Sequence, residues 1–120
     1  MSERRAVDYL NDMQEAASDA LLFVGGMDGE AFAGDKLIFK AVAFCHFTVG
    51  VAASRLLVTY PAFATEHPDL PWTKICGTGN RILDDVFDLD PSEIWEATQR
   101  TLPELLAAID GVRNWHAQGE

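Results

Sequence analysis

The sequence is poor in cysteine and in positive charge. Its two cysteines, Cys45 and Cys76, lie in different apolar stretches without metal-ligand spacing. We therefore expect two buried, reduced thiols in a cytoplasmic protein, and no metal site. Only 9 lysines and arginines stand against 19 aspartates and glutamates, which gives a formal net charge of −10. A protein that grips phosphates needs clustered cations, so general nucleic-acid binding is not expected, and the acidic surface favours a basic protein partner.

Other features are missing as well. No apolar run of about 18 residues is free of charge, so no membrane-spanning helix is predicted. The charged first residues are not followed by an apolar segment, so no signal peptide is predicted. Strand alternation, internal repeats and a Gly-rich phosphate loop between a strand and a helix are absent, and no cofactor is expected. At 120 residues and 48% hydrophobic, the chain is predicted to form a single domain over residues 1–120.

The sequence does contain helical periodicity. Apolar residues recur at spacings of three and four in four segments, which predict helices over residues 5–23, 36–60, 71–87 and 91–115. Asp35 is placed to cap the second helix. Pro103 lies inside the last helix and removes a backbone hydrogen bond, so we expect a kink or a short break near Thr101.

The second predicted helix, residues 36–60, is apolar on nearly every side. Such a helix belongs at the centre of a bundle or in a subunit interface. A four-helix protein of this size has no position surrounded by three other helices, so one face of this helix is predicted to meet a second copy. Gly50, Ala52 and Ala53 would allow close approach there.

The stretch from Leu70 to Trp95 is predicted to form a corner between the last two helices. Asp90 is placed as an N-cap, Pro91 as the first helical residue and Glu93 as the partner of a capping box. The apolar side of the preceding helix is predicted to consist of Ile75, Ile82, Leu83, Val86 and Phe87. The polar residues just before the corner are Asn80, Arg81, Asp84, Asp85 and Asp88.

This stretch resembles a known family. The matching positions are Pro71-Trp72, Ile75, Gly77, Asn80-Arg81, Phe87, Asp90 and Trp95, followed by Leu102-Pro103-Glu104-Leu105. Their spacing is similar to that of the HepT-like branch of the HEPN superfamily, small all-helical proteins of prokaryotic toxin–antitoxin pairs. The resemblance implies an all-α, up-and-down four-helix bundle of HEPN type. It also implies a homodimer with the RNase cleft at the subunit interface.

The departures from the family pattern concern its chemistry. Where the RNase motif has Arg, His and Tyr, this sequence has Gly79, Asp84 and Val86. Glycine offers no charge to a phosphate, and an aspartate, which ordinarily has a pKa of about 3.9, is a weak base at neutral pH. Val86 has no hydroxyl, so it cannot accept the nucleotide by which a partner nucleotidyltransferase silences some relatives. The resemblance therefore predicts a nuclease scaffold without its nuclease residues.

Three functions remain open. The first is a HepT-like dimer that does not cleave RNA and binds a nucleotidyltransferase-like or other protein partner. The second is a divergent, metal-independent endoribonuclease with Asn80, Arg81 and Asp84 as catalytic residues, and RNA is a partner only in this case. The third is a nucleotide or small-ligand binder at the dimer cleft. His46, Asp85 and Asp88 are then candidate binding residues, although His46 by itself is typical of a core or interface residue.

Overall fold

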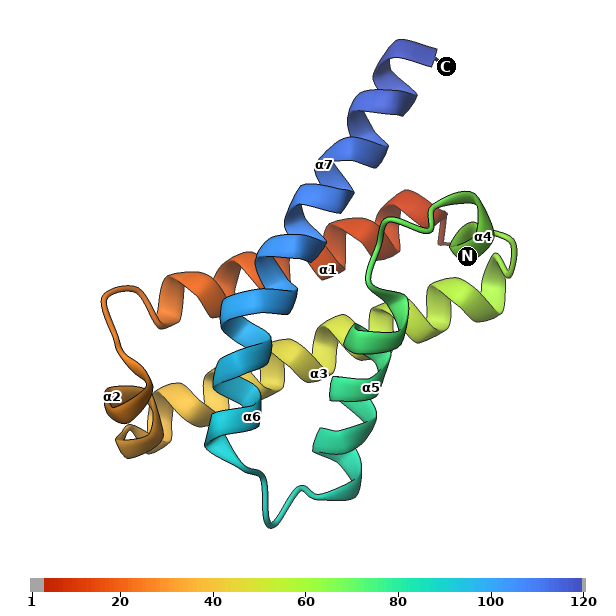
Figure 1. Cartoon of the computed structure of the whole chain (residues 1–120). Coiled ribbons are helices and arrows are strands. Elements are labelled where there is room, and N and C mark those ends of the chain that lie inside the picture. The colour runs from red at the N-terminus through yellow and green to blue at the C-terminus, as the bar shows by residue number, and fades with distance from the viewer. Residues whose placement is uncertain (1–3, 120) are drawn as a thin grey trace.

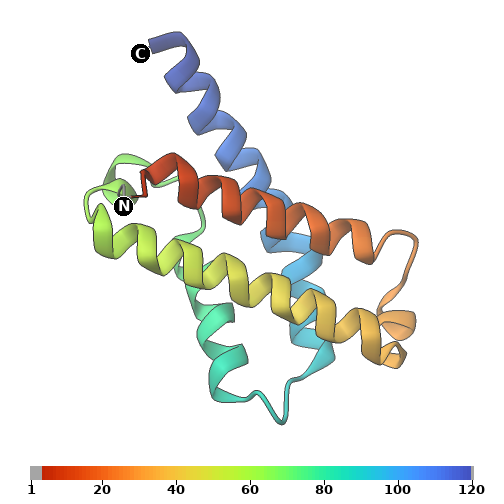
Figure 2. The ribbon, with the colours of Figure 1, turned by 180° about the vertical axis from the view of Figure 1, so that it is seen from behind.

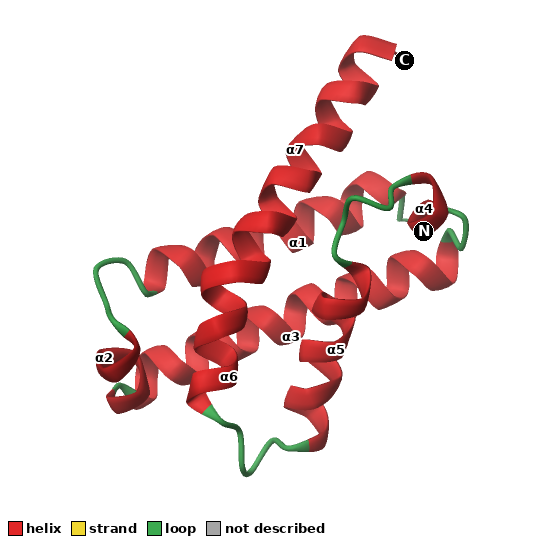
Figure 3. Cartoon of the chain, viewed as in Figure 1, coloured by secondary structure: helices red, strands yellow, loops and turns green. Residues whose placement is uncertain are grey.

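The computed structural model describes residues 4–119, and side chains through residue 112. Regular structure in this range is entirely helical (Figure 3). The elements are α1 (Ala6–Phe23), α2 (Gly29–Gly34), α3 (Lys36–Thr59), α4 (Phe63–Glu66), α5 (Trp72–Asp84), α6 (Pro91–Glu96), the π-helical turn η1 (Ala97–Thr101) and α7 (Leu102–Gly119). The prediction of an all-α fold is confirmed, with α6, η1 and α7 together forming the fourth long helix.

Figure 1 shows how the four long helices are arranged. α1 and α3 lie side by side and antiparallel, and the second pair, α5 and the α6–η1–α7 helix, crosses them steeply (Figures 1 and 2). α3 is central, because it packs against α1 on one side and α5 on the other, while α7 also packs against α1. The far end of α7 projects beyond the body of the molecule.

The core fills the space between α1, α3 and the last helix. Its largest fully buried side chains include Met13, Leu56, Leu102, Leu105 and Ile109. Phe32, which follows α1 in the sequence, is fully buried and makes ring contacts with Phe39 and Trp95. A short helix, α2, carries it, with Asp28 as its N-cap.

α3 is long and apolar enough to cross a membrane by length and composition alone. Half of its most apolar 18-residue window is buried inside the protein, as in the core helix of a soluble domain. Asp35 caps it as predicted, since its carboxylate accepts a hydrogen bond from the Ile38 N–H at 3.0 Å.

The end of α5 differs from the prediction. The helix stops at Asp84 instead of continuing to residue 87. Ile75 and Ile82 are buried as expected, but Leu83, Val86 and Phe87 are 62%, 56% and 95% exposed, so their expected burial is wrong. Asp84, Asp85 and Asp88 place negative charge at the negative end of the helix dipole, which disfavours further helix.

The start of the last helix is capped as predicted, but without the capping box. The Asp90 carboxylate accepts a hydrogen bond from the Ser92 N–H at 2.9 Å, with Pro91 in the first turn. Glu93 pairs instead with Arg81, so the predicted capping box is wrong. The break expected near Thr101 is confirmed as η1, which ends two residues before Pro103. A widened turn relieves the clash between a proline ring and the carbonyl four residues earlier.

Candidate functional site

A contact between two glycines fixes α5 against α3. A Cβ added to Gly50 would lie 2.9 Å from the Gly79 Cα and 3.1 Å from the Ile75 carbonyl oxygen. A Cβ added to Gly79 would lie 3.1 Å from the Gly50 Cα. Because neither residue has a side chain, the two backbones meet directly. Gly79, the position that the resemblance equates with the motif arginine, is therefore buried in a helix–helix contact.

Beside this contact, α3 and α5 enclose a shallow hollow of about 230 Å³. Phe47 and Val51 on α3 and Leu83 on α5 are its large apolar residues, and Arg55 is the only cation among the described residues that line it. Phe47, Val51 and Arg55 also line a second hollow of about 210 Å³, which adds Phe44. We call the surface formed by Phe44, Phe47, Val51 and Leu83 the α3–α5 face. It is largely apolar, and Phe44 is 68% exposed.

The structure separates the three predicted catalytic residues. Asn80 lines the hollow at the α3–α5 face, and Asp84 lies exposed one turn further along α5. Arg81 lies on the other flank of α5, because successive helical residues point about 100° apart. Its guanidinium pairs with Asp85 at 3.0 Å and with Glu93 at 2.9 Å. The i,i+4 pairing of Arg81 with Asp85 thus occurs, and Arg81 does not share a surface with Asn80.

The candidate binding residues do not share a surface either. Asp85 and Asp88 lie exposed in the turn after α5, together with Val86. His46 is 3% exposed and faces Thr98 of η1. Among the described residues, no group of three histidine, cysteine or acidic side chains is close enough to hold a metal ion.

His46 is a core residue with one defined partner. Its Nε2 lies 2.8 Å from the Thr98 hydroxyl, which itself donates to the Ile94 carbonyl at 2.7 Å. The hydroxyl proton is therefore used, and the imidazole Nε2–H donates to the Thr98 oxygen. Burial lowers the pKa of His46 from 6.5 to about 4, so the ring is neutral at physiological pH. His46 links α3 to η1 through this hydrogen bond. Because it is buried, it cannot exchange protons with solvent or act as a proton shuttle.

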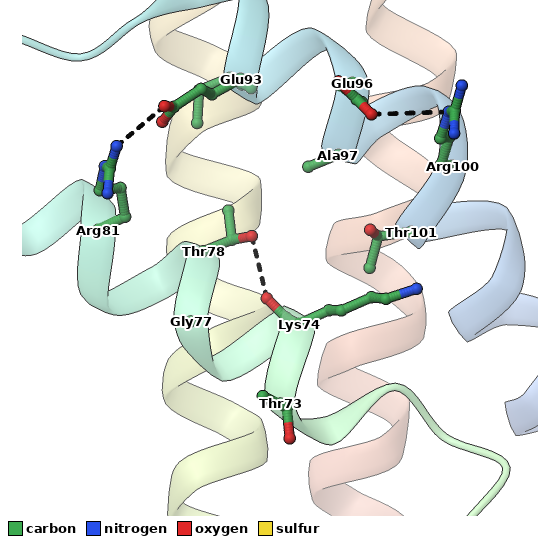
Figure 4. Close-up of a pocket in the computed structure, with 11 residues that line it drawn as sticks. Thr73, Lys74, Gly77, Thr78, Arg81, Glu93, Glu96, Ala97, Arg100 and Thr101 are labelled. Atoms are coloured by element: carbon green, nitrogen blue, oxygen red, sulfur yellow. Dashed lines mark hydrogen bonds and ion pairs between the residues drawn. The ribbon is translucent and has the colours of Figure 1, made fainter.

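A third hollow, larger than the two at the α3–α5 face, was not predicted. It has a volume of about 540 Å³ and lies between α5 and the α6–η1 segment, on the flank of α5 that carries Arg81 (Figure 4). Lys74 and Arg81 line it from α5, and Arg100 and Thr101 line it from η1. The spacing of Lys74, Thr78 and Arg81 at intervals of four and three, which places them on one helix face, is the signal that could have indicated it.

The two surfaces differ in chemistry. RNA cleavage without a metal needs a proton acceptor that titrates near neutrality and a cation that holds the phosphate. Among the residues whose side chains the structure describes, the α3–α5 face and its border offer Asn80, Asp84 and Arg55 but no histidine. This face is suited to covering by another apolar surface more than to acid–base chemistry.

Comparisons with known proteins give a consistent result. A family model described as "Ribonuclease HepT-like" matches residues 13–112. The chain is 26% identical over 110 residues to "Putative RNase MJ1380" of Methanocaldococcus jannaschii, covering 92% of this chain and 98% of the relative. It is 23% identical over 111 residues to "Probable ribonuclease HepT" of Thermococcus cleftensis, again covering 92% of this chain and 98% of the relative. No solved structure gave a significant match.

Proposed function

Because the chain belongs to the HepT-like ribonuclease family, we propose that it is a toxin–antitoxin-type protein that keeps the HEPN scaffold but does not cleave RNA. It acts in the cytoplasm by forming a homodimer and binding a protein partner. The family membership supports the scaffold, and the arrangement of α3 and α5 supports the loss of chemistry.

The observation that carries this proposal is the contact between Gly50 and Gly79. The position that we equate with the motif arginine is crowded, because a Cβ there would lie 3.1 Å from the Gly50 Cα. Position 79 therefore contributes to the packing of α5 against α3. An arginine there would require α5 and α3 to separate slightly, and its side chain would start from a buried position.

The other two motif positions, Asp84 and Val86, also support the proposed loss of RNase activity. Asp84 and Val86 are exposed at the end of α5 and in the following turn, where a histidine and a tyrosine would be accessible. Asp84 adds negative charge where an RNA phosphate would have to approach. Val86 offers no hydroxyl for nucleotide transfer. In this proposal a nucleotidyltransferase-like partner binds the protein without modifying it at this position.

Homodimerisation is supported by the α3–α5 face. Phe44 and Leu83 are large apolar side chains exposed side by side with Phe47 and Val51, and a second copy would cover them. α3 has no acidic residue, although the chain has 19, and it carries Lys36, Lys40 and Arg55. The neighbouring α1 presents Asp12, Glu15 and Asp19 beside Phe44. A two-fold interface would place the cations of one copy near the carboxylates of the other.

Partner binding is supported by the corner after α5. Phe87 is 95% exposed there, among the carboxylates of Asp84, Asp85 and Asp88. An exposed aromatic side chain surrounded by negative charge suits a partner with an apolar pocket and a basic rim.

The test of the proposed function is RNA cleavage in EDTA: the natural protein should leave a structured RNA intact, and cleavage that depends on Asp84 would contradict it.

A further inference from the structure

The hollow between α5 and η1, which we call the α5–η1 groove, contrasts with the charge of the rest of the molecule. Three cations line it, Lys74, Arg81 and Arg100, in a chain with a net charge of −10. Two carboxylates, Glu93 and Glu96, line it as well. Its volume of about 540 Å³ lies in the range of small-molecule sites.

Thr101 at the wall of this groove has an unusual side chain. It is 9% exposed, and its hydroxyl has no hydrogen-bond partner among the described residues. A helical threonine commonly donates to the carbonyl four residues earlier, and Thr48, Thr78 and Thr98 all do so. A buried hydroxyl without a partner is unfavourable and calls for an explanation. Figure 4 shows Thr101 on the wall of the groove, facing the space beside Lys74.

This hydroxyl lies at the end of the π-helical turn. The carbonyl four residues before Thr101 belongs to Ala97, and in η1 it accepts the N–H of Leu102, five residues further on, so the local geometry differs from that of the regular turns in which Thr48 and Thr78 donate. Pro103 favours the widened turn, because its ring would clash with the Gln99 carbonyl in a regular helix. Single π turns occur frequently at functional sites. The sequence near Pro103 therefore produces a buried donor directed at the groove.

The cations of the groove can change partners at little cost. Arg81 pairs with Glu93 at 2.9 Å, Lys74 with Glu104 at 3.5 Å and Arg100 with Glu96 at 3.7 Å. All six side chains are between 47% and 81% exposed, and exposed ion pairs contribute little to stability. A phosphate dianion that enters the groove can accept hydrogen bonds from these cations. The carboxylates that the cations release can then accept hydrogen bonds from other groups of the ligand.

The lining also indicates what else the ligand carries. None of the described residues that line the groove is aromatic, so they offer no platform on which a nucleobase could stack. Glu93, Glu96 and the threonines can instead hydrogen-bond hydroxyl groups. We propose that the α5–η1 groove binds a small phosphorylated polyol of the sugar-phosphate class, with Lys74 and Arg81 on the phosphate and the Thr101 hydroxyl as a buried hydrogen-bond partner. The groove lies on the opposite flank of α5 from the α3–α5 face, so this proposal does not depend on dimerisation or on the absence of RNase activity.

Isothermal titration calorimetry of the full chain tests this site, with ribose 5-phosphate as the probe. We expect binding in the micromolar to low-millimolar range, and at least tenfold weaker binding of ribose and of inorganic phosphate. AMP should bind no more tightly than ribose 5-phosphate, since its base finds no stacking partner. The proposal is overturned if ribose 5-phosphate does not bind, if inorganic phosphate binds equally well, or if AMP binds much more tightly.

Variants locate the binding. Lys74→Met and Arg81→Gln should each weaken it at least tenfold, whereas Arg55→Gln, which removes a cation from the α3–α5 face, should leave it unchanged. Thr101→Val should weaken binding several-fold while the melting temperature of the free protein stays the same or rises, because a hydroxyl without a partner is removed. Thr101→Ser should keep both the hydroxyl and the binding. Equal affinity in all of these variants would place the probe elsewhere and refute the assignment.

Discussion

Gly50 and Gly79 meet backbone to backbone where α3 crosses α5: a Cβ on Gly50 would lie 2.9 Å from the Gly79 Cα, and a Cβ on Gly79 would lie 3.1 Å from the Gly50 Cα. This contact fixes the position along α3 at which α5 packs. It therefore sets which residues of α5 border the α3–α5 face and which border the α5–η1 groove. The same contact occupies the position that we equate with the motif arginine.

Gly50→Ala should destabilise the protein. Its Cβ would lie 2.9 Å from the Gly79 Cα, and backbone atoms cannot yield as a flexible side chain can. Crowding of this kind costs about 1–3 kcal/mol, of which the better helix propensity of alanine offsets about 1 kcal/mol. Chemical denaturation should therefore show a net loss in the free energy of unfolding.

Gly77→Ala is the matched control for that loss. Gly77 lies in the same helix as Gly79, but a Cβ there would have no neighbour within 4 Å. We expect it to stabilise the protein by about 0.5–1 kcal/mol through helix propensity alone. If Gly50→Ala and Gly77→Ala shift stability in the same direction, the close contact between α3 and α5 is not as described.

His46 should make stability depend on pH. Its pKa is about 4 in the folded protein and 6.5 when unfolded, so between these values the unfolded chain binds more protons. The free energy of unfolding should therefore fall as the pH decreases from 6.5 to 4, by up to about 3 kcal/mol for this shift. The pKa values of Asp8 and Asp90 are lowered below 3.8, so their contributions are lost at still lower pH.

The variant His46→Gln isolates this effect. Glutamine can donate a hydrogen bond to the Thr98 hydroxyl oxygen but does not titrate. Urea denaturation at a series of pH values should show a steep decline between pH 6.5 and 4 for the natural protein, and a shallower one for the variant. Parallel curves would mean that His46 is not buried in its neutral form.

The α3–α5 face should control the oligomeric state. Light scattering should give a dimeric mass for the natural protein and a monomeric mass for Phe44→Glu and for Leu83→Glu. Both side chains are exposed in the single chain, so the monomer should remain folded. Thr73→Glu is the control, since Thr73 is exposed on the opposite flank of α5, where it lines the α5–η1 groove, and the change should leave the dimer intact. A monomeric natural protein would contradict the proposed interface.

Much of the fold could be predicted from local patterns. Apolar periodicity located the four long helices, Asp35 and Asp90 act as caps as predicted, and Pro103 marked the break that the structure shows as η1. Each of these features depends on residues close together in the sequence. The early end of α5 was not predicted, because the apolar pattern of Leu83, Val86 and Phe87 favours further helix, whereas the three nearby aspartates oppose it through the helix dipole.

The arrangement of the site could not be predicted in the same way. Gly50 and Gly79 are 29 positions apart, and nothing local to either one indicates that they touch. Helix geometry alone shows that Asn80 and Arg81 point in different directions, but only the packing of α6 and η1 shows that Arg81 faces Glu93. The unpaired hydroxyl of Thr101 likewise depends on a π turn whose register the sequence does not specify.

The absence of RNase activity is the central claim, and cleavage of a labelled, structured RNA in EDTA tests it most directly. A HepT-like relative that carries the motif Arg, His and Tyr serves as the positive control. A second protein restores these groups at exposed positions through Asn80→Arg, Asp84→His and Val86→Tyr, with the cation at residue 80 because residue 79 is buried against Gly50. Its matched control carries Asp84→Gln in place of Asp84→His and lacks only the titratable base.

We predict that the natural protein leaves the RNA intact under conditions in which the relative cuts it. The restored variant should gain cleavage that its glutamine control lacks. Cleavage by the natural protein that disappears in the single variant Asp84→Asn would contradict the account, and would show that the α5 surface around Asn80 and Asp84 is a working active site.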